Sequence, residues 1–268
     1  MIVHKLISNL LLQMESRNLE SFSVIPWAQP VLSFGSIAQS KMATLGLNPS
    51  NREFVDQYGN ELTGGARRFH TLSSLDIQSW SEADPRHKKS LFDACENYFN
   101  GNPYDNWFRA LERIFSGSSL SYYGMFAEVC HLDIVPFATF EKWGELGPSK
   151  RSGLIAATGN TLGNILRHSN IEVLILNGQS VIEALQEASG THLNRKNVPG
   201  WSLPRKNSGG VKGFSYKGKI SQVGGVCLKR DVNVLGFNHN IQSSFGVTSK
   251  VKSGITTWIT KNTREVLC

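Results

Sequence analysis

Four short apolar runs without polar alternation constrain the fold of this chain more than any other feature. They extend from Met42 to Leu47, from Val129 to Val135, from Val173 to Leu176 and from Val232 to Phe237. This pattern is typical of strands buried on both faces of a mainly parallel sheet. Such a sheet needs helices over both faces, so we predict an α/β fold with three layers, αβα, around a central sheet.

Segments between the runs carry helix signals. Asp84-Pro85 and Asn102-Pro103 each have the pattern of an N-cap residue followed by proline at the first helical position. Apolar residues at helical spacing predict further helices over residues 152–167, near the C-terminus, and after Lys5. Val31 to Phe34 predicts an additional edge strand.

Length and composition limit the class of protein. The 268 residues contain no linker-like segment, which predicts one domain covering residues 1–268. No apolar run approaches the length of a membrane-spanning helix, so no membrane partner is expected. The four cysteines lie far apart and form no C-x-x-C pair. This spacing indicates free thiols in a reducing cytoplasm, and it predicts neither a metal site nor a cofactor.

The positive charge is concentrated in one segment. The net charge is +7, yet residues 191–230 contain nine basic residues and no Asp or Glu. We predict a loop or β-hairpin inserted there between the third and fourth runs, with a polyanion as its natural partner. Arg205, Lys206 and Lys212 are the expected contacts of this basic insertion with the polyanion. A solvated basic loop without a ligand is the alternative.

Each apolar run leads into a polar motif. The four motifs, in chain order, are Gly46-Leu47-Asn48-Pro49-Ser50, His131-Leu132-Asp133-Ile134-Val135-Pro136-Phe137, Leu174-Ile175-Leu176-Asn177-Gly178 and Phe237-Asn238-His239-Asn240-Ile241. Because parallel strands end at the same edge of a sheet, we expect Asn48, Asp133 and His239 around one pocket.

The order of these motifs resembles that of the uracil-DNA glycosylase superfamily. The first motif is similar to the Gly-x-Asn-Pro-Gly of its Mug-type and single-strand-selective members, with Ser50 in place of the second glycine. The fourth keeps His239 but lacks the Pro-Ser-Pro that commonly follows it. The resemblance implies that Asn48 positions the attacking water and that His239 donates a hydrogen bond to O2 of the departing base. A strand-end turn at Asn48 and a structural histidine at position 239 are the alternatives.

Asp133 decides the expected substrate. Single-strand-selective uracil enzymes have an Asn at the corresponding position, which reads the pyrimidine edge. An ionised Asp133 offers only acceptors, so it repels O4 of uracil and accepts from the N4 amine of cytosine. A protonated Asp133 reads either base, and a buried capping carboxylate is the structural alternative.

Further residues near the motifs suit DNA contacts. Phe54 is a candidate for stacking on the extruded base, and Phe245 for wedging into the duplex. Arg67 and Arg68 are candidate phosphate contacts. The aromatic residues of the basic segment, Trp201 among them, suit stacking on bases. Core packing is the alternative for the aromatic side chains.

These features together predict a monofunctional DNA glycosylase that flips its target base and leaves an abasic site. No motif supplies a lysine for a Schiff base, so strand cleavage is not expected. The altered motifs resemble those of bacterial anti-phage glycosylases, which implies excision of a modified cytosine such as glucosylated 5-hydroxymethylcytosine. A repair glycosylase for uracil or mismatched pyrimidines is the first alternative. A non-catalytic DNA-binding module is the second, and no obligate protein partner is inferred.

Overall fold

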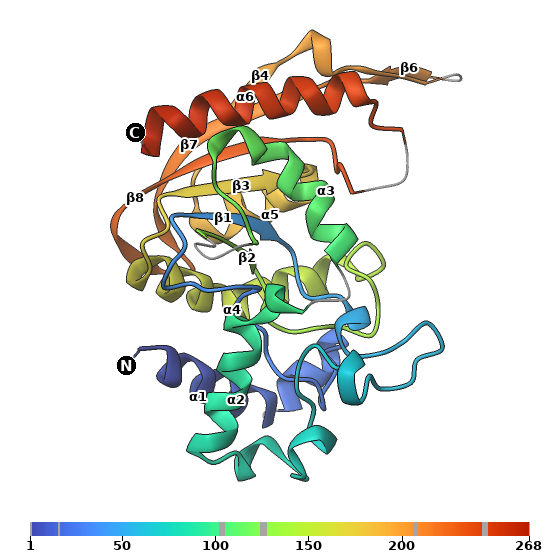
Figure 1. Ribbon diagram of the computed structural model, residues 1–268, viewed down its shortest axis with the longest axis vertical. Coiled ribbons are helices and arrows are strands. Elements are labelled where there is room, and N and C mark those ends of the chain that lie inside the picture. The colour runs from blue at the N-terminus through green and yellow to red at the C-terminus, as the bar shows by residue number, and fades with distance from the viewer. Residues whose placement is uncertain are drawn as a thin grey trace.

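The computed structural model describes residues 2–15, 17–101, 105–123, 128–205, 208–242 and 246–267 (Figure 1). The helices are α1 (Ile2–Glu15), α2 (Pro85–Glu96), α3 (Asp105–Phe115), α4 (Pro148–His168), α5 (Gln179–Ser189) and α6 (Ser249–Leu267). The strands are β1 (Met42–Gly46), β2 (Val129–Asp133), β3 (Val173–Asn177), β4 (Asn194–Asn197), β5 (Leu203–Arg205), β6 (Ser208–Val211), β7 (Phe214–Val223) and β8 (Val226–Phe237). Among the described residues, no helix is both long enough and apolar enough to cross a bilayer.

A six-stranded, mostly parallel sheet forms the centre of the fold. Its strand order is β2-β1-β3-β8-β7-β4. The four predicted strands β2, β1, β3 and β8 are parallel to one another, whereas β7 and β4 are joined by antiparallel pairing. The predicted α/β class and mainly parallel sheet are therefore confirmed.

The basic segment contributes strands to this sheet. β7 pairs with β8 over most of its length, and β4 pairs with β7 at the edge. Only β5 and β6 form a separate two-stranded sheet. The segment expected as an inserted loop or hairpin is thus largely an extension of the central sheet.

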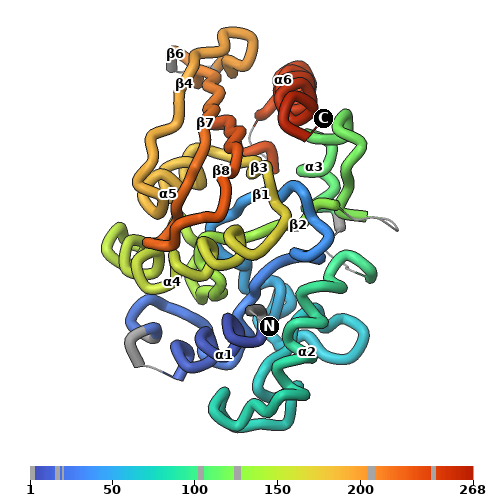
Figure 2. Tube along the Cα trace, turned by 90° about the vertical axis from the view of Figure 1, so that its left-hand side faces the viewer, coloured from blue at the N-terminus to red at the C-terminus, as the bar shows by residue number. Residues whose placement is uncertain are grey.

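Helices cover both faces of the strands. Figure 2 shows α5 on one side of the sheet and α3 with α6 on the other. α4 packs on β8 and α5, and α3 packs on α6. In both views α1 and α2 lie at the end of the molecule opposite α6.

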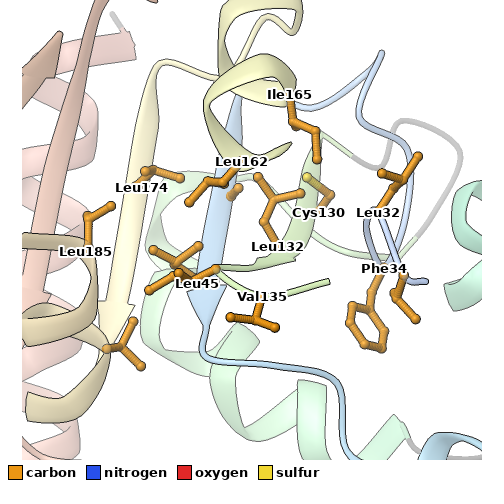
Figure 3. Packing of buried hydrophobic residues seen from close by; sticks show 14 of the residues in the cluster. Leu32, Phe34, Leu45, Cys130, Leu132, Val135, Leu162, Ile165, Leu174 and Leu185 are labelled. Atoms are coloured by element: carbon orange, nitrogen blue, oxygen red, sulfur yellow. The ribbon is translucent and has the colours of Figure 1, made fainter. Parts of the chain in front are cut away.

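The core lies where strands and helices meet. Leu45, Leu132 and Leu174 come from three adjacent strands and are at most 1% exposed. Leu162 and Ile165 of α4 pack over them (Figure 3). Every residue of β2 and β3 is buried, which explains why these runs show no polar alternation.

The structure confirms some of the helices and strands predicted from local sequence patterns and contradicts others. Asp84 caps α2 as predicted, accepting hydrogen bonds from Arg86 N at 2.7 Å and His87 N at 2.9 Å. Residues 152–167 lie within α4, but Asn102-Pro103 lies outside the described residues. The predicted strand at Val31 to Phe34 is wrong, because only Phe34 pairs with β2 and Gly35 then turns the chain with φ +91°. No sequence pattern predicted helix α5.

Glycines allow the turn between β7 and β8 to lie against α4. Gly224 adopts φ +55°, and a Cβ there would lie 2.1 Å from the carbonyl carbon of Gly159 in α4. The neighbouring Gly225 has φ +74°, but a Cβ there would meet nothing within 4 Å. The two glycines share a left-handed backbone and differ in the space around them.

Gly224→Ala should therefore destabilise the protein more than Gly225→Ala. Both variants carry the left-handed strain of about 1–2 kcal/mol. Gly224→Ala adds a clash with the α4 backbone, which costs about 1–3 kcal/mol more. The free energy of unfolding in urea measures both changes, and equal losses would show that the turn does not press on α4.

Candidate active site

A cavity of about 580 Å³ opens at the carboxyl ends of the parallel strands. The chain leaves β1 toward β2 on one side and leaves β3 toward β8 on the other. Ligand sites of open α/β sheets lie where the connections diverge in this way. The cavity volume is in the range of small-molecule sites. Asn48, Asp133 and Asn177 line it from three strand ends.

Asp133 places a carboxylate in the cavity wall. Its side chain is only 3% exposed, and no described residue donates a hydrogen bond to it. Gly46 lies opposite Asp133 in the β1–β2 register, and a Cβ there would be 2.3 Å from Asp133 Oδ1. The first glycine of the first motif thus makes the room that this carboxylate occupies.

His131 lies beside Asp133, since residues two apart share one face of a strand. Its Nε2 is 3.5 Å from Asp133 Oδ1, and its Nδ1 is 2.7 Å from Thr44 Oγ1. Thr44 also contacts the hydroxyl of Tyr122, which has no other described partner. The buried Tyr122 hydroxyl must donate to Thr44, which in turn donates to Nδ1. A neutral His131 therefore carries its proton on Nε2, beside Asp133.

Asn48 has its amide orientation fixed by two acceptors. Nδ2 donates to Thr139 Oγ1 at 3.0 Å and to the Phe137 carbonyl at 3.3 Å. No described residue donates to Oδ1. Because Asn48 lines the cavity, this oxygen is the group that it can offer to a ligand or to water.

Glu53 adds a second buried carboxyl to the cavity wall. Ser50 caps the short turn Asn51–Glu53 by accepting from Arg52 N. Tyr98 donates to Glu53 Oε2 at 2.7 Å, and Arg68 Nη1 lies 3.6 Å from the same oxygen. Burial outweighs both and raises the pKa of Glu53 to about 7. This carboxyl can exchange a proton near neutral pH.

Asn177 organises the loop that follows β8. Its Oδ1 accepts from Ile241 N at 3.1 Å, and its Nδ2 donates to Gln242 Oε1 at 2.7 Å and to Asn240 Oδ1 at 3.3 Å. Gln242 Nε2 then donates to the Trp107 carbonyl at 3.1 Å. These bonds join β3, the fourth motif and α3 into one wall, and Asn240 and Gln242 line the cavity.

His239 does not reach this cavity, which corrects the expected convergence. The side chain is buried, and Nε2 lies 2.6 Å from the Trp201 carbonyl oxygen. A carbonyl only accepts, so Nε2 carries the proton and donates it there. Burial lowers the pKa of His239 despite this bond, and the ring has no second proton to donate at neutral pH.

Two further predicted site residues, Phe54 and Arg68, lie outside the cavity lining. Phe54 is 1% exposed and packs on Trp27 and Phe69, so core packing excludes it from the cavity. Arg68 faces inward, donating to the Arg52 carbonyl at 2.7 Å and pairing with Glu53 instead of a surface phosphate. Arg67 is half-buried and lies outside the cavity lining.

Other residues line the cavity in their place. Trp107 is 39% exposed and Trp143 is half-buried, and both belong to the lining. Arg52 and Lys142 supply positive charge there. Arg52 follows β1, Lys142 and Trp143 follow β2, and Trp107 lies in α3, so tertiary contacts bring these residues to the cavity.

The basic segment contains both exposed basic side chains and the buried side chain of Trp201. Lys212 is exposed, and Arg205 ends β5, whereas Lys206 and Phe245 lie outside the described residues. Trp201 is 4% exposed and packs on Trp258 of α6, so it is not a stacking platform for bases.

Comparison with known proteins adds no family. Neither a protein-family model nor a curated protein matches the sequence. Within the described ranges, no group of three His, Cys, Asp or Glu side chains is placed to hold a metal ion.

Glu53→Gln should change how stability depends on pH. A carboxyl with its pKa raised from 4.5 to about 7 stabilises the fold least above pH 7, because the unfolded chain ionises first. Between about pH 5 and pH 8 the wild type should lose on the order of 2 kcal/mol of unfolding free energy through this group. Glu53→Gln should abolish that loss in urea unfolding at the two pH values.

Tyr98→Phe serves as the directional control for this measurement. It removes the hydrogen bond that favours the Glu53 anion, so the loss of stability should become larger. An unchanged pH dependence in Glu53→Gln would contradict the assignment.

Proposed function

We propose that this protein is a monofunctional DNA glycosylase that hydrolyses the N-glycosidic bond of a flipped cytosine-type base. The observation that carries the proposal is the buried carboxylate of Asp133, which faces a cavity and accepts no hydrogen bond from the described residues. The nearest described N–H is that of His131 Nε2, 3.5 Å from Oδ1, so the buried carboxylate keeps acceptor capacity that a ligand with N–H groups would satisfy.

The edge of cytosine suits the Asp133 and His131 pair. Cytosine presents the N4 amine beside the N3 acceptor. The carboxylate of Asp133 accepts from the amine, and His131 Nε2–H donates to N3. Uracil presents the opposite order, an O4 acceptor beside an N3–H donor. The order of donor and acceptor groups along the base edge therefore determines which base Asp133 and His131 can bind.

Asn48 suits the hydrolytic step. The C1′–N bond breaks with its electron pair leaving on the base, and the oxygen of one water forms the new bond to C1′. The water loses a proton, and the departing base gains one from solvent. Asn48 Oδ1 accepts from the water and orients it, although an amide is too weak a base to take the proton.

The resemblance of the four motifs implies a uracil-DNA glycosylase-like fold. It also implies that the protein belongs to the branch that removes hypermodified cytosine from phage DNA in the bacterial cytoplasm. The four parallel motif strands and the open cavity support this assignment. Exposed basic side chains on β4 and after β6 supply charge for a DNA backbone.

Two other functions make different predictions. A uracil or mismatch repair enzyme would use the same cavity with N3–H of the base on Asp133. A non-catalytic DNA-binding module would bind in a salt-sensitive manner and release no base.

A base-release assay separates these three functions. Duplex and single-stranded oligonucleotides would carry uracil, 5-hydroxymethylcytosine or its glucosylated form at one position. We expect release of a modified cytosine and an intact abasic strand, and Asn48→Ala should slow release about 10²-fold without weakening DNA binding. Release of uracil alone would refute the proposed substrate, and binding without release of any base would refute the enzyme.

Asp133→Asn should shift the choice of base. An amide both donates and accepts, so the variant loses its preference for the N4 amine and tolerates O4 of uracil. The ratio of single-turnover rates for modified cytosine and uracil should fall roughly 5- to 150-fold. This change corresponds to a loss of about 1–3 kcal/mol of discrimination between the two bases. An unchanged ratio would show that Asp133 does not read the base.

A further inference from the structure

We infer that Asn240, not His239, donates the hydrogen bond that stabilises the departing base, an inference that rests on the proposed function. Loss of the C1′–N bond leaves negative charge on the base, and a fixed donor at that charge lowers the barrier. The structure brings Asn240 to the cavity at the place where the fourth motif ends.

The amide orientation of Asn240 follows from its neighbours. Oδ1 accepts from Gln242 N at 3.0 Å and from Asn177 Nδ2 at 3.3 Å. Both partners are donors, so the oxygen must face them and Nδ2 must face away. Among the described residues, none accepts from Nδ2. Asn240 therefore presents an N–H donor that its protein partners leave available.

His239 cannot supply the same donor in this arrangement. Its Nε2 proton is used by the Trp201 carbonyl, and burial favours the neutral ring. Redirecting the ring would orphan a buried carbonyl. The adjacent Asn240 lines the cavity instead.

Asn48 and Asn240 are complementary in what they offer to the cavity. Asn48 has its Nδ2 occupied and offers an oxygen, which suits the attacking water. Asn240 has its oxygen occupied and offers Nδ2, which suits the departing base. An acceptor that orients the water and a donor at the negative charge of the departing base each favour hydrolysis.

Asn240→Asp tests the assignment because it keeps the shape and the acceptor but removes the donor. On an oligonucleotide with glucosylated 5-hydroxymethylcytosine, the single-turnover rate should fall about 10²- to 10³-fold. The control is Asn238→Asp, which adds the same charge in the same loop, keeps the acceptor for Phe214 N and lies outside the cavity lining, although it loses the 2.9 Å bond from Nδ2 to the Lys212 carbonyl. Its rate at saturating enzyme should stay within about threefold of wild type, and DNA affinity is measured for both.

A second substrate separates catalysis from structural damage. The electron-withdrawing group of 5-formylcytosine stabilises negative charge on the leaving base, so its release depends less on a donor. The defect of Asn240→Asp should shrink at least about tenfold on this base. An equal defect on both bases, or wild-type rates in the variant, would overturn the inference. A wild type that releases no base refutes the proposed function before any variant is compared.

Discussion

The parallel alignment of β2, β1, β3 and β8 is the constraint on which the rest of the structure depends. Because these strands end at one edge, residues as distant in the chain as Asn48 and Gln242 come to line one cavity. The register fixes details as well as position. Gly46 lies opposite Asp133, and only the missing side chain of the glycine leaves room for the carboxylate. A shift of one residue would turn Asp133 to the other face of the sheet.

Hydrogen bonds within the protein then decide what each side chain can offer to a ligand. Asn48 and Asn240 are the same residue type, yet one offers an oxygen and the other an N–H because their partners differ. The Tyr122–Thr44–His131 series likewise sets which imidazole nitrogen carries the proton. Buried polar groups need hydrogen-bond partners, and these bonds determine whether the atom left facing the cavity is a donor or an acceptor.

The sequence predicted the four parallel strands and the position of Asn48 and Asp133, because buried strands and their polar ends leave local patterns. The sequence did not predict which of two adjacent residues faces the cavity, because tertiary contacts determine this. His239 and Asn240 are neighbours, and their contacts with Trp201 and Asn177 decide which of them reaches the cavity. Phe54 was buried by aromatic neighbours distant in the chain, and the raised pKa of Glu53 arises from burial that no local motif encodes.

A crystal structure of the Asn48→Ala protein with duplex DNA that carries glucosylated 5-hydroxymethylcytosine would show directly whether a flipped base occupies the cavity. Slow hydrolysis in this variant would keep the substrate intact. We expect the target base to leave the stack and enter the cavity, with N4 within hydrogen-bond distance of the Asp133 carboxylate. DNA bound elsewhere on the surface, with the target base stacked in the duplex, would contradict it.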